Sequence, residues 1–561
     1  MIRTFERHKI RYQKELSESI WKFTPCEGKY SNVAFDAIVP GCWENMPEFG
    51  AYRGEGIYSR KIEIGGNIRF EFKGVSHTAT VYLDGNKIAS HYNAYTIFDT
   101  VIPNLDYGTH QLEVRVDNRF STDSALHVPN DYMTYGGIIR PVVLEVVPNV
   151  YIESMGLTPK KVEDEWRLKV DVRLKNIGRD NVKSYELVLQ GMEQEVKVDE
   201  IEIEAGQSIE VGTEFICPKV QLWDFNSPTL YEITALLNYD GGVIDDLIDR
   251  VGFREVKIEG KQILLNGKPI RIKGFCRHED HPQFGCALSF SAIQADIMLI
   301  RDLGANSIRT THYPNNEIFL DLCDEQGILV WEENHARGLS LEQMENPKFE
   351  IQAECCIKEM INAHYNHPCI YIWGILNECA SDTMYGRQCY KKQYELIKEL
   401  DPTRLRSSAS CKFKTDICLD IPEVISYNIY PEWYVDINAS EYLEDLYAWV
   451  QEDLGNSEKP FLITETGAGA IYGNRSSYLA KWSEEYQSKA LQDQIRAVFE
   501  HPGCSGVYIW QFCDNRISSE YFLNRPRTMN NKGVVDEFRR RKLSYYIVKS
   551  LFQAYGNYIE T

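Results

Sequence analysis

The sequence predicts a multidomain β plus α/β fold with three units. They are a jelly-roll β-sandwich at residues 1–150, an immunoglobulin-like β-sandwich at 151–256 and a C-terminal (β/α)8 TIM barrel at 257–561. Two patterns and the length predict this order. Apolar residues alternate with polar ones in the first part, and near Lys257 short apolar strands begin to alternate with amphipathic helices. A chain of 561 residues also exceeds one ordinary domain.

Both sandwiches are predicted from a period of two and from turn residues. In the first, Leu112, Val114 and Val116 alternate with polar residues, and residues 84–86 (DGN) separate two short strands as a hairpin turn. In the second, every other residue from 166 to 174 is apolar. This alternation is typical of strands with one buried face.

The barrel is predicted from short apolar runs, because strands covered on both faces lose the alternation. We expect strands near 270–276, 305–310, 328–332, 369–377, 406–410, 424–430, 461–465 and 505–511. Helices are expected between them, among others at 291–303, 315–326, 349–365 and 386–400. The carboxyl ends of barrel strands meet at one rim, where catalytic residues lie.

Two of these strands end on carboxylates. The apolar run 369–376 is followed by Asn377 and Glu378, and the run 461–464 by Glu465. Glycosidic bond cleavage needs a pair of carboxyl groups, so two glutamates across one barrel mouth predict a glycoside hydrolase. The alternative is that each glutamate is an ion-pair partner at a strand end.

Composition limits the partners and the compartment. With 61 basic and 82 acidic residues the net charge is −21, which argues against nucleic acid or an anionic membrane as partner. No signal peptide and no apolar run of about 20 residues are visible. Fifteen cysteines without a C-x-x-C pair are typical of free thiols in a reducing compartment, so we expect a cytoplasmic protein.

Four motifs resemble glycoside hydrolase family 2 in order and spacing. They are 274–280 (GFCRHED), 309–314 (RTTHYP), 373–378 (WGILNE) and 463–467 (ITETG). The order of two sandwiches and a barrel is also similar, so the resemblance covers nearly the whole chain. It implies a retaining double displacement that needs no cofactor. Residues 334–336 do not reproduce the metal-binding Glu-x-His of the family's galactosidase branch, so no metal is expected.

The resemblance assigns the chemistry to named residues. Glu465 would be the nucleophile and Glu378 the acid/base, with their carboxyl groups about 5–5.5 Å apart. The acid needs a raised pKa to hold its proton near neutral pH. Asn377 would hydrogen-bond the sugar 2-hydroxyl. Arg277 is expected to keep the nucleophile ionised, with a structural rim arginine as the alternative.

A further motif resembles the β-glucuronidase branch of the family. Residues 528–533 (TMNNKG) contain an Asn-x-Lys pair, Asn530 and Lys532, which in that branch grips the uronic acid carboxylate. A lysine ammonium makes a charge-assisted contact that a neutral hexose cannot return. The alternative is an ordinary solvated loop.

Other matches to this branch imply additional substrate-binding residues: Asp131, His312, Asn428, Tyr430, Tyr434 and Trp510. Asp131 would come from a loop of the first sandwich. Tyr430 would support the nucleophile, Tyr434 would reach the carboxylate, and Trp510 would form the floor of the sugar subsite.

One position departs from the β-glucuronidase pattern, which has an apolar residue where Arg337 stands. A guanidinium beside the sugar could donate to an axial 4-hydroxyl or to the carboxylate. We therefore favour an exo-acting β-galacturonidase, with β-glucuronidase second. The alternative is that Arg337 points outward or pairs with Glu332 or Glu333.

Two rival functions are also compatible with the sequence, a β-galactosidase and, from another class, a non-catalytic carbohydrate-binding protein. The expected partners are small uronide conjugates or uronate-terminated oligosaccharides. The segment 337–349 is short and leaves an open rim, which a neighbouring subunit would complete, so we expect a homo-oligomer.

Overall fold

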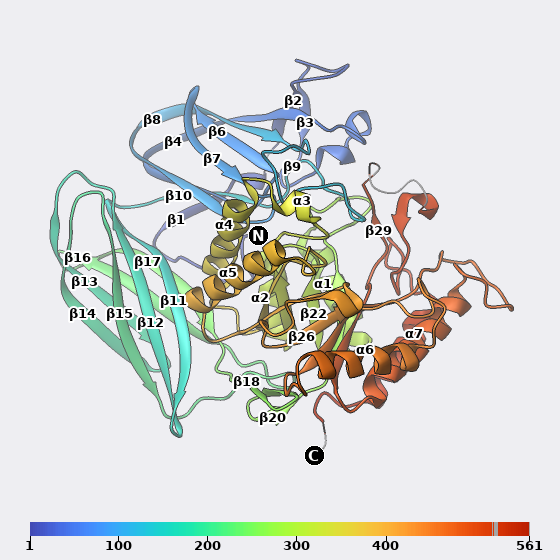
Figure 1. The fold of residues 1–561 in the computed structure, drawn as a ribbon. Helices are drawn as coiled ribbons and strands as arrows, with labels where there is room; N and C mark the ends of the chain where they lie inside the picture. Colours follow the sequence, from blue (N-terminus) through green and yellow to red (C-terminus); the bar gives the residue numbers. More distant parts are fainter. Residues whose placement is uncertain (19, 519, 521–524, 560–561) are drawn as a thin grey trace.

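The computed structural model describes residues 1–18, 20–518, 520 and 525–559. In Figure 1 a β-rich part lies at the top, a second β-rich part at the lower left, and a barrel with its helices at the centre and right. The predicted β plus α/β fold is confirmed. Its division at residues 150 and 256 stays a prediction.

The first β-rich part is one sheet in the order β1-β10-β4-β8-β6-β7, with β2 paired to β4 and β3 paired to β2. Its strands are β1 (Tyr12–Glu15), β2 (Trp21–Pro25), β3 (Phe35–Ala37), β4 (Glu55–Phe72), β6 (Thr78–Leu83), β7 (Asn86–Tyr92), β8 (Phe98–Asp117) and β10 (Val142–Val146). A separate ladder joins β5 (Val75–Ser76) to β9 (Gly137–Ile138). Leu112, Val114 and Val116 on β8 are buried in one core with residues of β4 and β6, as their alternation predicts.

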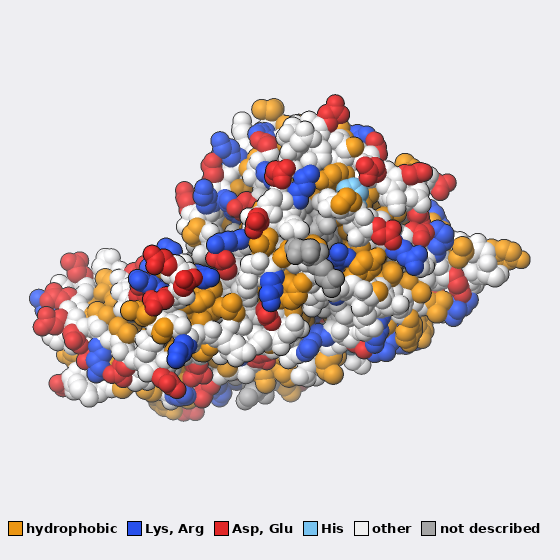
Figure 2. Space-filling view, turned by 90° about the horizontal axis from the view of Figure 1, so that it is seen from below, with side chains coloured by type: hydrophobic (Ala, Val, Ile, Leu, Met, Phe, Trp, Pro, Cys, Tyr) orange, Lys and Arg blue, Asp and Glu red, His pale blue; other side chains and the backbone are white. Residues whose placement is uncertain are grey.

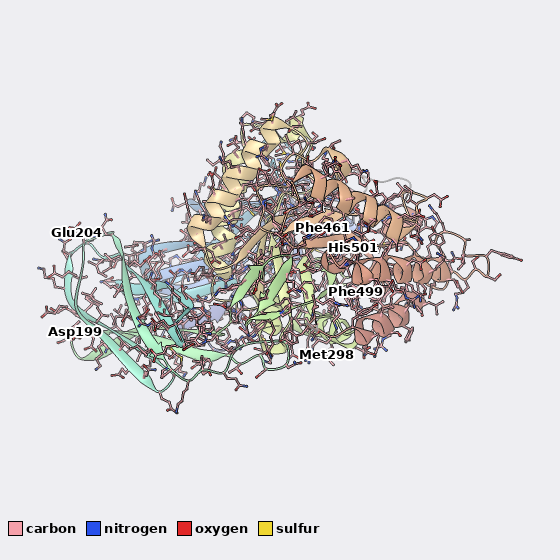
Figure 3. All side chains as sticks on the ribbon, turned by 60° about the horizontal axis from the view of Figure 1, so that its bottom comes forward. Asp199, Glu204, Met298, Phe461, Phe499 and His501 are labelled. Atoms are coloured by element: carbon pink, nitrogen blue, oxygen red, sulfur yellow. The ribbon has the colours of Figure 1, made fainter. Side chains whose placement is uncertain are left out.

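The second β-rich part packs two sheets face to face, in the orders β11-β12-β15 and β14-β13-β16-β17. Its strands are β11 (Val150–Val162), β12 (Glu165–Asn176), β13 (Val182–Gly191), β14 (Gln194–Ile203), β15 (Ser208–Cys217), β16 (Tyr231–Tyr239) and β17 (Gly242–Val251). Trp166 and Leu174 on β12 point into the shared core. Asp199 and Glu204 lie at the outer end of this sandwich, far from the barrel (Figure 3).

A parallel eight-stranded sheet forms the barrel, in the order β25-β24-β23-β22-β21-β28-β27-β26. Its strands are β21 (Ile272–Arg277), β22 (Ser307–Thr310), β23 (Leu329–Glu333), β24 (Ile370–Ile375), β25 (Leu405–Ser408), β26 (Ile425–Asn428), β27 (Phe461–Thr466) and β28 (Cys504–Ile509). Ser410, just after β25, closes the ring through backbone hydrogen bonds with Ser426 and Asn428. A small sheet of β18 (Val256–Glu259), β19 (Gln262–Leu265) and β20 (Lys268–Pro269) precedes it. All eight strands were predicted within a few residues.

Helices cover the outside of the barrel. They are α1 (Phe290–Asp302), α2 (Glu317–Gln326), α3 (Leu341–Met344), α4 (Phe349–His364), α5 (Met384–Leu400), α6 (Ala439–Asp453), α7 (Glu484–Glu500) and α8 (Leu543–Ala554). Several begin at a side chain that accepts a backbone N–H, such as Ser289 before α1 and Asn316 before α2. Figure 3 shows three residues in the barrel part of the molecule: Phe461 of β27, and Phe499 and His501 at the end of α7.

The surface carries both signs of charge. Basic and acidic side chains are interspersed over the face in Figure 2. Among the described residues, none of the helices combines the length and the apolar character that a bilayer crossing requires.

One loop of the first sandwich reaches the barrel mouth. Tyr135 donates to Asp280 (2.6 Å), and Asn515 donates to the backbone oxygen of Asp131 (3.2 Å). Arg140 further forms an ion pair with Glu279 at 2.8 Å. The sandwich therefore contributes side chains to the rim where the barrel strands end.

Candidate active site

A cavity of about 340 Å³ opens at the carboxyl ends of the barrel strands. It is lined by Asp131, Arg337, Glu378, Cys411, Asn428, Ile429, Tyr430, Tyr434, Val435, Tyr442, Glu465, Trp510, Arg525 and Lys532. Nine of the thirteen residues expected from the sequence are in this lining. Three others hydrogen-bond to residues in or near it: His312 to Glu333, Asn377 to Arg309, and Asn530 to Asp131. The thirteenth, Arg277, is not in the lining.

Glu465 is buried at the end of β27 and is held by two donors. Its Oε1 accepts from Nη1 of Arg309 (2.9 Å) and its Oε2 from the Tyr430 hydroxyl (2.7 Å). Burial and the charge of Glu378 raise the pKa of Glu465 to about 8, although Arg309 and Tyr430 act in the opposite direction. Burial and the neighbouring charge thus favour the neutral form of Glu465, whereas its two donors favour the ionised form.

Glu378 follows β24 and has a more open position. Its side chain is 16% exposed, against 2% for Glu465. Its Oε1 accepts from Nδ2 of Asn428 (3.0 Å), and its Oε2 lies 3.3 Å from Nη2 of Arg337. The backbone φ of 55° turns this residue out of the strand direction and toward the cavity wall.

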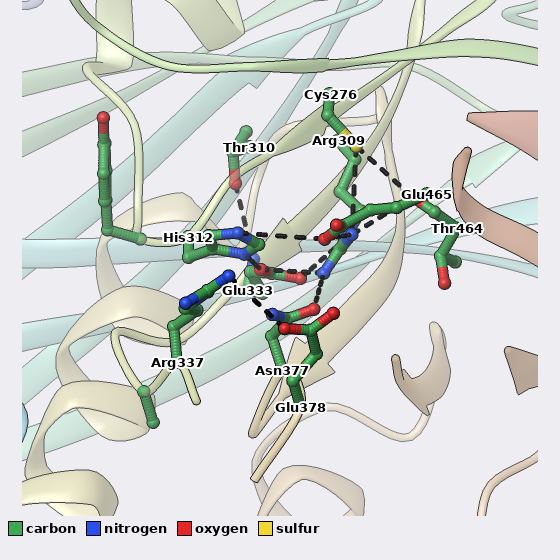
Figure 4. A network of polar contacts seen from close by, with 12 residues as sticks. Cys276, Arg309, Thr310, His312, Glu333, Arg337, Asn377, Glu378, Thr464 and Glu465 are labelled. Atoms are coloured by element: carbon green, nitrogen blue, oxygen red, sulfur yellow. Dashed lines mark hydrogen bonds and ion pairs between the residues drawn. The ribbon is translucent and has the colours of Figure 1, made fainter. Parts of the chain in front are cut away.

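Arg309, at the inner face of β22, joins the polar groups under the cavity (Figure 4). Its guanidinium bonds both oxygens of Glu333 (2.9 and 3.1 Å), Oε1 of Glu465 and Oδ1 of Asn377 (2.6 Å). This fork holds three side chains, Glu333 of β23, Glu465 of β27 and Asn377 just after β24. A single cation thus orients both the buried glutamate and the amide beside Glu378.

The expected role of Arg277 is wrong. Its guanidinium forms an ion pair with Asp296 of α1 (2.9 Å) and contacts Asn315, outside the barrel. Cys276, the preceding residue of β21, donates instead to the Thr464 backbone oxygen inside the barrel. Because successive side chains of a strand point to opposite faces, Arg277 must point away from the cavity. Arg309 occupies the expected place beside Glu465.

His312 and Trp510 lie on one side of the site. Their rings stack with centroids 5.2 Å apart, and Nδ1 of His312 hydrogen-bonds Glu333 (2.7 Å). Burial and the charge of Arg309 hold the pKa of His312 well below its usual range, so the ring is neutral. His312 therefore acts as a neutral hydrogen-bonding group here.

Arg337 points into the cavity. Its Nη2 lies 3.4 Å from Asp131 and 3.3 Å from Glu378, and its Nη1 donates to Asn130 (2.7 Å). The outward orientation and the pairing with Glu332 or Glu333 are not observed. The guanidinium instead bridges the first sandwich and the carboxylate at the end of β24.

Asp131 is the point where the first sandwich enters the site. It accepts from Nδ2 of Asn530 (3.2 Å) and faces Arg337 and Arg525 (3.7 Å). Burial would raise the pKa of Asp131, but Arg337, Arg525 and Lys532 lower it below its usual value. The carboxylate is therefore charged at neutral pH.

Lys532 is a buried cation in the cavity wall. It is 1% exposed, and its Nζ lies over the rings of Tyr434, Tyr430 and Trp433 at 5.1, 5.7 and 5.8 Å. Within the described residues no carboxylate oxygen lies at ion-pair distance from Nζ, and burial lowers the pKa of Lys532. Such a cation is suited to an anion that comes from solution.

Sequence reasoning missed several residues of this site. Arg309 and Glu333 lie at the carboxyl ends of two neighbouring strands, as Glu465 does, and that pattern could have found them. Arg525, which donates to the Tyr434 hydroxyl (3.3 Å), and Cys411 lie in loops without a local signal. Tyr442, also in the lining, lies on helix α6.

Comparison with known proteins assigns the family. Residues 256–554 match the glycosyl hydrolases family 2 TIM barrel domain, and residues 150–254 match a second part of that family. This chain belongs to glycosyl hydrolase family 2. It is therefore a glycoside hydrolase, and the family's retaining chemistry applies to it.

Solved structures and curated relatives refine the comparison. Two structures of a β-galacturonidase from Eisenbergiella tayi, one with glycerol and one with galacturonate, have a TM-score of 0.97 and 59% identity over 100% of both chains. A β-glucuronidase from Streptococcus agalactiae is 27% identical and covers 87% of this chain and 88% of its own. A Formosa agariphila protein is 29% identical, and the match covers 89% of this chain but 64% of that protein.

Proposed function

We propose that this glycoside hydrolase is an exo-acting β-D-hexuronidase that prefers β-galacturonides. The observation that carries the proposal is the buried ammonium of Lys532, which has no carboxylate partner among the described residues and faces the cavity that holds Glu378 and Glu465. A sugar carboxylate would neutralise this charge, whereas a neutral hexose would leave it unpaired. Asn530 and Tyr434 would complete the carboxylate site.

In the proposed mechanism Glu465 attacks the anomeric carbon while Glu378 gives its proton to the leaving oxygen. The aglycone departs as an alcohol, and the sugar remains as an ester of Glu465. Glu378 then takes a proton from water, whose oxygen displaces Glu465 and releases the free uronic acid. After Glu378 has given up its proton in the first step, it is a carboxylate, which is the form that can accept the proton from water in the second step.

Arg309 and Tyr430 would keep Glu465 ready for attack. Both lower the pKa of Glu465 against the raising effects of burial and of the Glu378 charge, and they therefore favour the ionised form that attacks the anomeric carbon. Asn377 would bind the sugar 2-hydroxyl through its buried Nδ2, which has no partner among the described residues.

The preference for galacturonides rests on Arg337. A guanidinium between Asp131 and Glu378 adjoins the space for the sugar ring, where it would donate to an axial 4-hydroxyl. The likeness to a β-galacturonidase at 59% identity supports this choice. The relatives named β-glucuronidase, at 27–28% identity, favour β-glucuronidase as the second candidate.

The test compares p-nitrophenyl β-D-galacturonide with the matching glucuronide. We expect a higher kcat/KM for the galacturonide in the wild type, and Arg337→Leu should move the ratio toward the glucuronide by about tenfold or more, as for loss of one charged hydrogen bond. Arg525→Leu is a matched comparison, because Arg525 also faces Asp131 but donates to Tyr434, whereas Arg337 pairs with Glu378. An unchanged ratio in Arg337→Leu would mean that Arg337 does not select the sugar.

The remaining expectations are proposed on the same basis. Two rival functions predict different assay results. A β-galactosidase would turn over a galactoside but not a hexuronide. If the protein only bound carbohydrate, the wild type and Glu465→Ala would show the same negligible rate. We propose small uronide conjugates or uronate-terminated oligosaccharides as substrates, a cytoplasmic location and a homo-oligomeric assembly. The fifteen cysteines, all free thiols in the structure, support the reducing compartment.

A further inference from the structure

A second cavity lies at the other end of the barrel, between β24 and the second sandwich. It has a volume of about 370 Å³ and is lined by Leu157, Thr158, Pro159, Lys160, Lys161, Trp166, Val251, Gly252, Arg254, Glu255, Val256, Lys257, Tyr365, Asn366, Pro368, Pro402, Thr403 and Arg404. None of these residues lines the cavity with the two glutamates. This region has no part in the chemistry proposed above.

Arg254 in this cavity differs from the other buried arginines. The buried arginines of the described residues are Arg3, Arg11, Arg140, Arg254, Arg277, Arg309 and Arg404. Six of these seven have a carboxylate oxygen within 3.2 Å. Arg254 has no ion pair with any described residue. A buried charge without a counter-ion is costly, so an unpaired one calls for a partner from solution.

The contacts of Arg254 leave one nitrogen available. Its Nε donates to the Pro368 backbone oxygen and its Nη2 to that of Ile370, both at 2.6 Å. Nη1 donates to no described residue, and it is not among the enclosed polar atoms that lack a partner. Since the side chain lines the cavity, Nη1 is open to that space.

Several basic side chains adjoin this point, and the two carboxylates that act on Arg254, Asp401 and Asp324, already pair with Arg404 and His367. Lys160 and Lys161 stand exposed at the rim, and the Arg404 guanidinium lies nearby. Glu255, the acidic residue in the lining, already pairs with Lys257 at 2.6 Å. Burial and the charge of Arg404 lower the pKa of Arg254, an effect that a bound anion would reverse. The hydroxyls of Thr158 and Tyr365, 2.8 Å apart, add neutral polar groups.

We propose that this cavity binds a small oxyanion, a carboxylate or a phosphate, through Nη1 of Arg254 with Lys160 and Lys161 at its entrance. The volume accommodates an anion as large as a sugar acid. Because Arg254 holds the backbone at the start of β24, the bound anion stabilises the contact between the second sandwich and the strand that precedes Asn377 and Glu378.

The experiment measures binding by calorimetry in a Lys532→Ala background, which removes oxyanion binding at the barrel mouth. Sodium phosphate and sodium galacturonate are titrated separately, with sodium chloride at equal ionic strength as a blank. We expect saturable binding of at least one anion with a Kd near or below about 1 mM. Whichever anion binds more tightly identifies the natural class, a sugar acid or a phosphate.

Variants test whether the heat measured by calorimetry comes from binding in this cavity. Lys160→Glu/Lys161→Glu should weaken binding tenfold or more, whereas Lys61→Glu/Lys87→Glu, with the same charge change on exposed lysines of the first sandwich, should not. Arg254→Gln should abolish it, and the rim variant keeps the test independent of folding because its lysines are exposed. Absence of saturable binding, or equal weakening by both lysine pairs, would overturn the proposal. Hydrolysis of hexuronides is unaffected by either outcome.

Discussion

The two glutamates of the barrel mouth have different surroundings. Glu465 on β27 is enclosed and receives hydrogen bonds from a cation and a phenol, Arg309 and Tyr430. Glu378, after β24, is partly open and contacts Asn428 and the Arg337 guanidinium. The enclosed carboxylate is held in one orientation, and the open one can exchange protons with solvent and a leaving group.

This difference indicates how one site divides two roles between identical side chains. Fixed donors around Glu465 suit a group that must attack one atom from one direction. Access at Glu378 suits a group that must lose and regain a proton in each cycle. The variants below test each side of the comparison.

The largest effect is expected from the two glutamates themselves. Glu465→Gln should reduce kcat by more than about 10⁴-fold on every substrate, because no covalent intermediate can form. Glu378→Gln should lower the rate of glycosidic bond cleavage about 10²–10⁴-fold for an alkyl galacturonide. The loss should be much smaller for the p-nitrophenyl galacturonide, because p-nitrophenolate leaves without a proton. Equal losses on both leaving groups in Glu378→Gln would contradict the assignment of the acid.

Replacement of Arg309 should lower kcat about 10- to 100-fold. Arg309→Lys keeps the charge but loses the fork that joins Glu465, Glu333 and Asn377, at a cost typical of charged hydrogen bonds. The matched control is Arg277→Lys, which changes an arginine that faces Asp296 outside the barrel. Steady-state kinetics should separate the two variants; similar kcat values would refute the role of Arg309.

A smaller effect, about tenfold, is expected for Tyr430→Phe, which removes one hydrogen bond to Glu465. The Tyr430 hydroxyl lowers the pKa of Glu465, so its loss should move the acidic limb of the pH profile of kcat/KM to higher pH. A lower kcat with an unmoved acidic limb would assign Tyr430 a purely steric role.

The smallest expected effect concerns stability. The raised pKa of Glu465 means that the folded state holds this proton more tightly than the unfolded state, so stability falls as pH rises from about 4.5 to about 8. Glu465→Gln removes that loss. Its Tm should exceed that of the wild type at pH 8 and approach it near pH 5. A Tm below that of the wild type at pH 8 would be the contrary result.

Most of the fold could be predicted because local patterns determine it. The run 369–377 corresponds to β24, Ile370–Ile375, and the predicted helix 349–365 to α4, Phe349–His364. Continuous burial of a parallel strand and amphipathic helix spacing both leave a signal in neighbouring residues.

The site was harder to predict where it depends on the direction of a side chain or on a residue from a distant part of the sequence. Arg277 and Arg309 both lie near the end of a barrel strand, and only the in-register pairing of Cys276 with Arg309 fixes which arginine faces inward. Asp131 reaches the mouth from another sandwich, and its contact with Arg337 spans about 200 positions, so no local pattern encodes it.

The most direct test concerns the cationic clamp for an anionic sugar. It compares kcat/KM for p-nitrophenyl β-D-galacturonide and p-nitrophenyl β-D-galactoside, which differ at the carboxylate that Lys532 would bind, in the wild type and in Lys532→Met. We predict a strong preference for the galacturonide in the wild type and its loss in the variant. Equal turnover of both sugars by the wild type would contradict a hexuronidase built around Lys532.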